Sequence, residues 1–206
     1  QEAAGNVDSV NESFIIDTTA PNSPVIESYA RDHTGIRGIS VEMAGDADVL
    51  QVAENGTISD VAETATPIPA LGETFYSFTP TVADGSHLIV KTEDSAGNTS
   101  GTYLAFDGRA TTAFDLSNAG LGAHEIETVD LQFADQADLT ITEAQLKGLS
   151  ANSDTLVVHG GSDDTVTISG ATKTSETKVI DGETHDVYTL GDTGVVIIDD
   201  DIQVVI

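Results

Sequence analysis

Short runs of alternating apolar and polar residues, separated by turn residues, make up the first half of the chain. These runs are rich in β-branched and aromatic residues, which favour strands, and they cover 25–29, 39–43, 49–52, 75–78 and 87–91. Asn-Gly, Asp-Gly and Gly-Asn pairs lie between or beside them, as is typical of tight turns. No window in this half repeats apolar residues at helical spacing. The pattern therefore predicts two antiparallel sheets packed face to face.

The second half has the same strand-like pattern with one interruption. We expect strands at 113–116, 126–131, 139–141, 155–158, 165–168, 186–190, 195–198 and 204–206. Between the third and fourth of these, Thr142 and Gln145 have the spacing of a capping box, which marks the start of a helix. Leu146 and Leu149 would face inward, and Gly148 keeps that helix short. The whole sequence thus predicts a mostly β protein, a β-sandwich followed by a second β-rich domain with one short helix.

A motif near the N-terminus recurs about one domain length later. Residues 2–6 (Glu-Ala-Ala-Gly-Asn) match residues 94–98 (Asp-Ser-Ala-Gly-Asn), and each motif is followed by an apolar strand that ends in an aspartate, Asp17 or Asp107. The two glycines lie 92 positions apart, which matches the length of a sandwich domain. We therefore interpret the chain as part of an array with three pieces: 1–17 as the last strand of a preceding repeat, 18–108 as one complete sandwich and 109–206 as a second β-rich domain.

Two motifs in the first half resemble a known family. Asp17-Thr18-Thr19-Ala20-Pro21-Asn22-Ser23-Pro24, together with Asp94-Ser95-Ala96-Gly97-Asn98-Thr99-Ser100, is similar to the bacterial Ig-like repeats of giant RTX adhesins, which are exported by type I secretion. The resemblance implies an extracellular location at the bacterial cell surface, tandem Ig-like sandwiches, calcium at the junctions between repeats and a stiff rod that supports cell adhesion or biofilm formation. Residues 107–110 (Asp-Gly-Arg-Ala) depart from the opening of another such repeat. The following residues, 126–166, are similar to a non-Ig module of the same adhesins.

The chain is strongly acidic along its whole length. Its 206 residues contain 35 Asp and Glu against 7 Lys and Arg, a formal charge of −28 that is shared equally between the two halves. Such a chain has no basic surface with which to neutralise phosphates, which argues against nucleic-acid binding. No apolar run approaches the roughly 20 residues of a membrane helix, and we expect no direct membrane insertion. A compact fold of this charge repels itself unless salt or divalent cations compensate, and a soluble or halophilic surface is the alternative interpretation.

The positions of several aspartates indicate calcium as the cofactor. The primary candidates end strands at predicted junctions or flank a tight glycine turn: Asp17, Asp94, Asn98 and Asp107. Oxygen atoms in loops at a junction could share an ion with the next module. The alternative is that Asp17 and Asp94 cap turns through nearby backbone groups. Weaker candidates follow a strand or a glycine pair, and for them a solvated turn is the simpler interpretation: Asp163, Asp164, Asp199 and Asp200.

Signatures of catalysis and of other metal sites are missing from the sequence. The five histidines lack zinc-site spacing, there is no cysteine, and no Gly-x-Ser-x-Gly motif occurs. Residues 46–51 and 160–166 begin like an EF-hand loop and an RTX nonapeptide, but both lack required glycines and oxygen ligands. We therefore expect no enzyme. The leading hypothesis is a calcium-stiffened spacer whose partners are neighbouring repeats of the same chain, and the alternative is a calcium-dependent module that binds a peptide or glycan.

Overall fold

A computed structural model describes residues 17–42, 46–106, 113–114 and 116–206. In these residues the chain forms strands β1 to β17, the α-helix α1 and one 3-10 turn, η1 (Leu121–His124). The predicted mostly β fold with one short helix is confirmed. No helix in this part of the chain has the length and apolar character needed to cross a membrane.

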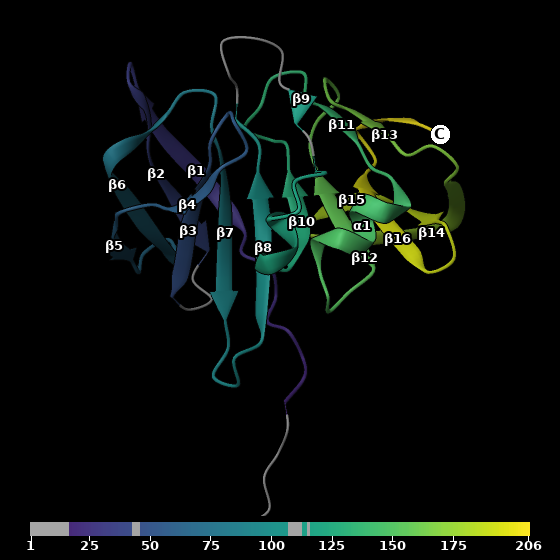
Figure 1. The fold of residues 1–206 in the computed structure, drawn as a ribbon, viewed down its shortest axis with the longest axis horizontal. Helices are drawn as coiled ribbons and strands as arrows, with labels where there is room; N and C mark the ends of the chain where they lie inside the picture. Colours follow the sequence, from purple (N-terminus) through teal and green to yellow (C-terminus); the bar gives the residue numbers. More distant parts are fainter. Residues whose placement is uncertain (1–16, 43–45, 107–112, 115) are drawn as a thin grey trace, which may run out of the picture.

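The first half folds as an Ig-like sandwich of two antiparallel layers (Figure 1). One layer has the order β1-β2-β6-β5 and the other the order β8-β7-β3-β4, which corresponds to the two sheets of an Ig domain. Apolar side chains from both layers, such as Ile39 and Leu88, meet in its core. The strands are β1 (Ile26–Asp32), β2 (Gly35–Glu42), β3 (Ala47–Val52), β4 (Ile58–Asp60), β5 (Glu63–Ile68), β6 (Glu73–Ala83), β7 (His87–Glu93) and β8 (Thr99–Leu104).

The second half consists of parallel strands that coil between two sheets. Its parallel strands are β9 (Ala113–Phe114), β10 (Ile126–Asp130), β11 (Asp138–Thr140), β12 (Thr155–His159), β13 (Thr165–Thr167), β16 (Gly194–Asp199) and β17 (Gln203–Val205). One sheet contains the neighbours β8, β10, β12 and β16, and the other contains β9, β11, β13 and β17. Because the chain passes from one sheet to the other and back, these strands form four coils of a parallel β-solenoid.

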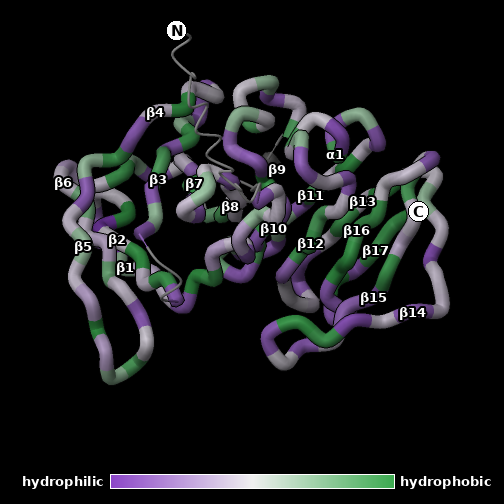
Figure 2. Tube along the Cα trace, turned by 90° about the horizontal axis from the view of Figure 1, so that it is seen from below, coloured by the Kyte–Doolittle hydropathy of each residue, from purple (hydrophilic) through white to green (hydrophobic). Residues whose placement is uncertain are grey.

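Apolar residues stack in rows from one coil to the next. One row crosses four strands through the register partners Tyr103, Val129, Val158 and Ile198. The opposite sheet supplies a second row of Leu139, Val166 and Val204. In the first row each residue is at most 2% exposed. In Figure 2 the hydrophobic colour runs along β12 and β16 themselves. Burial of these rows between the sheets is the main source of stability of the solenoid.

Strand β8 belongs to both halves of the molecule. It pairs antiparallel with β7 and parallel with β10, so one sheet of nine strands, which we call the shared sheet, runs β14-β15-β16-β12-β10-β8-β7-β3-β4. The larger hydrophobic cluster includes Leu50, Val52 and Ile89 from the first half. The domain boundary expected at residue 108 lies outside the described residues, but β8 before it and β10 after it are neighbours in one continuous sheet. Whether the two halves fold separately stays a prediction.

A helix and a hairpin are inserted into the coils. Helix α1 (Glu143–Leu149) begins with the predicted capping box, in which Gln145 N–H donates to Thr142 Oγ1 while Thr142 N–H donates to Gln145 Oε1. Leu146 and Leu149 are buried, as expected. The hairpin of β14 (Thr172–Ile180) and β15 (Glu183–Leu190) extends the shared sheet at its edge. Its turn returns toward the middle of the molecule and becomes one wall of the cleft described below.

Candidate functional site

Three of the four primary calcium candidates meet where the chain enters the sandwich. Asp17 begins the incoming segment (residues 17–25), which runs beside the β7–β8 turn at the bottom of Figure 1. The side-chain amide of Asn98 donates to Asp94 Oδ2 at 2.8 Å and to the backbone carbonyl of Asp17 at 3.3 Å. Residues 81 positions apart are thus in direct contact. The fourth candidate, Asp107, lies outside the described residues.

The same carboxylates cap local turns. Asp94 Oδ1 accepts hydrogen bonds from the backbone N–H groups of Ala96 and Asn98 at 2.8 and 2.9 Å. The side-chain bond from Asn98 contributes most to holding the pKa of Asp94 below its usual value. Asp17 Oδ1 accepts from the backbone N–H of Thr19 at 3.0 Å. Turn capping is therefore real at both positions, and it leaves lone pairs on each carboxylate for a further partner.

The donor chemistry of this cluster suits calcium, although the number of ligands falls short of a full shell. Calcium takes six to eight oxygen ligands. Asp94 Oδ2 and the Asp17 carbonyl converge on the amide nitrogen of Asn98, and an Asn side chain also offers an oxygen. In the described part of the chain, no group of three or more His, Cys, Asp or Glu side chains is placed to hold a metal. A calcium ion here would take its remaining oxygens from water or from atoms outside the described residues.

Asp163 and Asp164 lie in the β12–β13 turn and bind the neighbouring coil. Asp164 is 2% exposed. Its Oδ1 accepts from the Ala137 N–H at 2.9 Å and its Oδ2 accepts from the Gly161 N–H at 2.8 Å. Asp163 Oδ2 accepts from the Gln136 N–H at 3.2 Å. These bonds tie the β12–β13 turn to the β10–β11 turn, which is a structural role.

Asp199 and Asp200 close the β16–β17 turn. Asp199 ends β16, is 4% exposed, and its Oδ1 accepts from the Asp201 N–H at 3.2 Å. The backbone N–H of Asp200 donates to the Thr184 carbonyl at 2.9 Å. The carboxylates of this turn and those of the β12–β13 turn therefore form no common metal site within the described residues.

A cleft of about 900 Å³ opens on one face of the shared sheet, a volume typical of small-molecule sites. The layer that contains β1 and β2 covers this face in the first half. Farther along the sheet the same face is left open over β10 and β12, which form the floor together with β8. The incoming segment forms one wall, where Thr102 Oγ1 donates to the Pro24 carbonyl at 2.6 Å. The turn between β14 and β15 forms the other wall.

Acidic side chains surround this cleft. None of its lining residues, all within the described part of the chain, is a Lys or an Arg, whereas six are acidic: Glu27, Glu42, Glu127, Asp130, Asp181 and Glu183. Four of them are exposed at the rim, Glu127 is half-buried, and Asp130 is buried in the floor. Sequence reasoning missed the site because its lining comes from segments that lie far apart in the chain, and no local motif joins them.

Asp130 and His159 are neighbours in the cleft floor. They are register partners in the parallel pair of β10 and β12. Asp130 is 5% exposed, and its Oδ1 accepts from the Gln132 N–H at 2.9 Å. No described residue forms a hydrogen bond to its Oδ2. Burial raises the pKa of Asp130 to about 7, and repulsion from Asp164 acts in the same direction.

His159 pairs with His185, which is fully buried. Nδ1 of His159 lies 3.1 Å from Nε2 of His185, and Nδ1 of His185 lies 3.2 Å from the Glu183 carbonyl oxygen. A carbonyl only accepts, so His185 carries its proton on Nδ1 and its Nε2 accepts from the Nδ1–H of His159. Nε2 of His159 is therefore an acceptor, and it has no partner among the described residues. Burial lowers the pKa of His159, which favours this neutral form.

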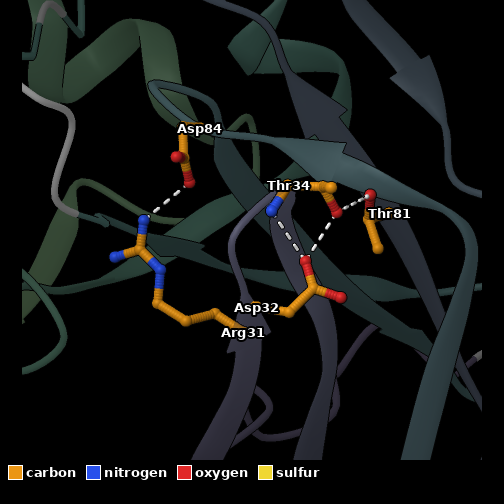
Figure 3. Close-up of polar contacts among 5 residues, drawn as sticks. All are labelled: Arg31, Asp32, Thr34, Thr81 and Asp84. Atoms are coloured by element: carbon orange, nitrogen blue, oxygen red, sulfur yellow. Dashed lines mark hydrogen bonds and ion pairs between the residues drawn. The ribbon is translucent and has the colours of Figure 1, made fainter.

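The basic residues pair with carboxylates outside the cleft. Figure 3 shows Arg31, which donates to Asp84 at 2.6 Å and so joins the end of β1 to the β6–β7 turn, beside the hydrogen bonds of Thr34 to Asp32. Four more ion pairs are Arg37–Asp32, Lys91–Asp48, Lys147–Glu143 and Lys173–Asp186. Among the Lys and Arg residues that the structure describes, only Lys178 makes no ion pair, and it does not line the cleft. The negative charge of the cleft is therefore not neutralised from within the described chain.

The function of this chain has to be inferred from its own residues. No protein-family model, curated protein or solved structure matches it.

Proposed function

We propose that this chain is an extracellular segment of a large bacterial surface adhesin, where it acts as a calcium-stiffened spacer. In this role it holds a binding domain away from the cell and supports cell adhesion or biofilm formation. Its partners are the neighbouring repeats of the same chain. The proposal is supported by the resemblance of residues 17–24 and 94–100 to the Ig-like repeats of RTX adhesins, and by the Ig-like strand order of the first half.

The observation that carries the proposal is the contact of Asn98 with both Asp17 and Asp94. The two motifs that resemble the adhesin repeats are distant in the sequence and come together where the chain enters the sandwich. A divalent ion shared by the Asp17 carbonyl and the Asp94 carboxylate would fix the incoming segment against the β7–β8 turn. Without an ion, the amide of Asn98 links Asp17 to this turn, while farther along the incoming segment Thr92 and Thr102 donate to the carbonyls of Asn22 and Pro24.

Calcium binding at such a site would have a large effect on stability. Calcium sites of extracellular modules bind with dissociation constants near 10⁻⁴ M. A hundredfold excess of calcium then stabilises the folded state by about 2.7 kcal/mol per site. For a chain of this size, that corresponds to a rise in melting temperature of about 5–10 °C.

A calcium titration followed by thermal melting tests the proposal. The wild-type chain should melt about 5–10 °C higher in about 10 mM calcium than in EDTA. Asp94→Asn retains an oxygen for the Oδ1 turn bonds but loses the charge of the ligand, so it should reduce this rise. Asp17→Asn leaves the backbone carbonyl in place and removes only a neighbouring charge, so it should reduce the rise less. Asp60→Asn is the matched control, because it removes the same charge from an exposed position in β4.

Two further measurements separate a specific site from general screening of charge. Sodium chloride at the same ionic strength should reproduce only a small part of the calcium effect. In solution scattering, calcium should also narrow the distribution of shapes of the wild-type chain and not that of Asp94→Asn. A calcium response that is equal in the wild type, Asp17→Asn and Asp94→Asn would contradict the junction site.

The cleft favours a second candidate function, a calcium-dependent module that binds a peptide or glycan. Its wall includes the incoming segment, so an ion that holds Asp17 would also shape the cleft. The lining contains no Phe, Tyr or Trp on which a sugar ring could stack, which favours a peptide over a glycan. Peptide and glycan arrays probed with and without EDTA test this function, and absence of binding in both conditions would rule it out.

A further inference from the structure

We propose that the cleft binds an alkylammonium group, the chemical group shared by linear polyamines and lysine side chains, and that Asp130 and His159 are its hydrogen-bond acceptors. This inference concerns a site other than the Asp17–Asn98 cluster and does not depend on calcium. Three features of the cleft support it: its uncompensated charge, the unpartnered acceptors of its floor, and the apolar surface between them.

The charge of the cleft selects a cation. Six acidic residues line a single concavity, and no Lys or Arg of the described chain enters it. Four of these residues stand at the rim, where they attract a cationic ligand from solution, and two lie deeper, where water screens them less. The negative potential of these side chains repels an anionic ligand and gives a neutral one no attraction, whereas it stabilises an ammonium group.

The floor offers acceptors without donors. Asp130 Oδ2 has no protein partner among the described residues, although the residue is 95% buried. Beside it, the hydrogen-bond chain from Glu183 through His185 leaves Nε2 of His159 as an acceptor. A primary ammonium carries three N–H donors and no acceptor, so it matches a floor that offers acceptors on two neighbouring strands. A hydroxyl-rich sugar lacks the positive charge, and a guanidinium is planar and broader.

The apolar residues of the walls and floor suit an aliphatic stem. Pro24, Val157 and Ile180 line the same cleft as the acidic residues, and each is buried or half-buried. The methylene chain of a lysine or a polyamine would cover this apolar surface while its ammonium group reaches the floor. A bare metal ion would use none of it, and the described residues form no group of three or more metal ligands.

Titration calorimetry at pH 8 in about 150 mM salt with EDTA tests the site, because salt screens nonspecific attraction to the acidic surface. The probes are spermidine, Nα-acetyl-lysine methylamide, and the same lysine compound acetylated on Nε. We expect saturable binding of both cationic probes to one site and no binding of the neutral probe. Tighter binding of spermidine would identify a free polyamine as the natural source, and tighter binding of the lysine probe would identify a protein partner.

The variant Asp130→Asn should weaken binding of the cationic probes by about tenfold or more, since it removes a charged hydrogen bond. Asp60→Asn, which removes a charge outside the cleft, should change it less than about twofold. Thermal melting verifies that Asp130→Asn is folded. The proposal is wrong if wild type binds neither cationic probe, if the neutral probe binds as well as the cationic ones, or if both variants weaken binding equally. Because EDTA is present throughout, these outcomes are independent of the calcium titration.

Discussion

Tyr103 of β8 and Val129 of β10 are register partners in a parallel pair, and both lie in the core of the solenoid. The next residue of β8, Leu104, lies instead in the core of the sandwich. Because successive side chains of a strand point to opposite faces, β8 contributes alternate residues to two hydrophobic cores. The strand is therefore a wall common to both halves of the molecule.

Gly101 and Gly148 provide a matched test of this common wall. A Cβ on Gly101 of β8 would lie 2.5 Å from the His124 carbonyl oxygen, whereas a Cβ on Gly148 of α1 would meet nothing within 4 Å. Gly101→Ala should therefore lower the free energy of unfolding by about 1–3 kcal/mol, and Gly148→Ala should raise it by about 0.5–1 kcal/mol. Denaturant unfolding should show a single transition for each chain. Its midpoint should move to lower denaturant concentration in Gly101→Ala and to higher concentration in Gly148→Ala. Two transitions, only one of which moves, would mean that the halves unfold independently.

Asp164→Asn tests whether this aspartate is structural or a calcium ligand. The carboxylate accepts from two backbone N–H groups, those of Ala137 and Gly161. An asparagine has one acceptor oxygen, so its NH₂ group would face one of these donors and leave it unpaired. The variant should lose about 1–3 kcal/mol of stability, as measured by denaturant unfolding, and keep the full calcium response.

Asp163→Asn is the control for this comparison. Its side chain accepts a single hydrogen bond of 3.2 Å from the Gln136 N–H, which the oxygen of an asparagine can still accept. The free energy of unfolding should change by less than about 0.5 kcal/mol. If Asp164→Asn were instead as stable as the wild type and had lost its response to calcium, the structural assignment would be wrong.

The sequence predicts those strands whose apolar residues alternate, and it misses those that carry few of them. The strands around Ile39 and Val158 are both present, with ends shifted by a few residues. The missed strands β4, β5 and β14 are each at an edge of a sheet, and most of their residues are exposed. Edge strands with polar side chains resist pairing with other chains, and the same composition removes the periodic signal.

The solenoid and the cleft depend on contacts that local pattern does not record. A strand buried in a parallel coil has the same alternation as a strand in an antiparallel sandwich, so β10 and β12 carry no mark of their parallel pairing. The contact of Asp17 with Asn98 could be predicted from the sequence, because both residues belong to motifs that resemble one family. Asp130 and His159, in contrast, become neighbours only through the register of two parallel strands.

The hydrogen-bond chain through His185 predicts the tautomers of two histidines. In neutral solution, nitrogen-detected NMR should find both His159 and His185 protonated on Nδ1, because the Glu183 carbonyl accepts from the first donor in the chain. His33, which is exposed, is the internal reference for a histidine in water. Addition of spermidine should shift the Nε2 resonance of His159 and leave that of His33 unchanged. A proton on Nε2 of His159 in the unliganded chain would contradict the assignment.

Asp130→Asn should make the protein more stable at alkaline pH, although the variant removes a candidate ligand-binding residue. The pKa of Asp130 is raised from 3.8 to about 7 in the folded chain, so between these values the folded state binds more protons than the unfolded state. The free energy of unfolding contributed by this group is therefore fully present below pH 4 and is lost as the pH rises toward 7. Asparagine does not ionise and escapes this loss.

Denaturant unfolding at pH 4 and pH 8 measures the effect. Wild type and Asp130→Asn should have similar stability at pH 4, and the variant should be more stable at pH 8, by up to about 4 kcal/mol. Asp164, which repels the Asp130 carboxylate, and His159, its register partner, are both unchanged in the variant. Asp60→Asn should follow the wild type at both pH values, and parallel profiles for all three chains would contradict the burial of an ionisable Asp130. The ionised Asp130 carboxylate destabilises the unliganded fold, and its Oδ2 has no partner in the described chain. A cation bound at this atom would compensate the buried charge, as the proposed ammonium site requires.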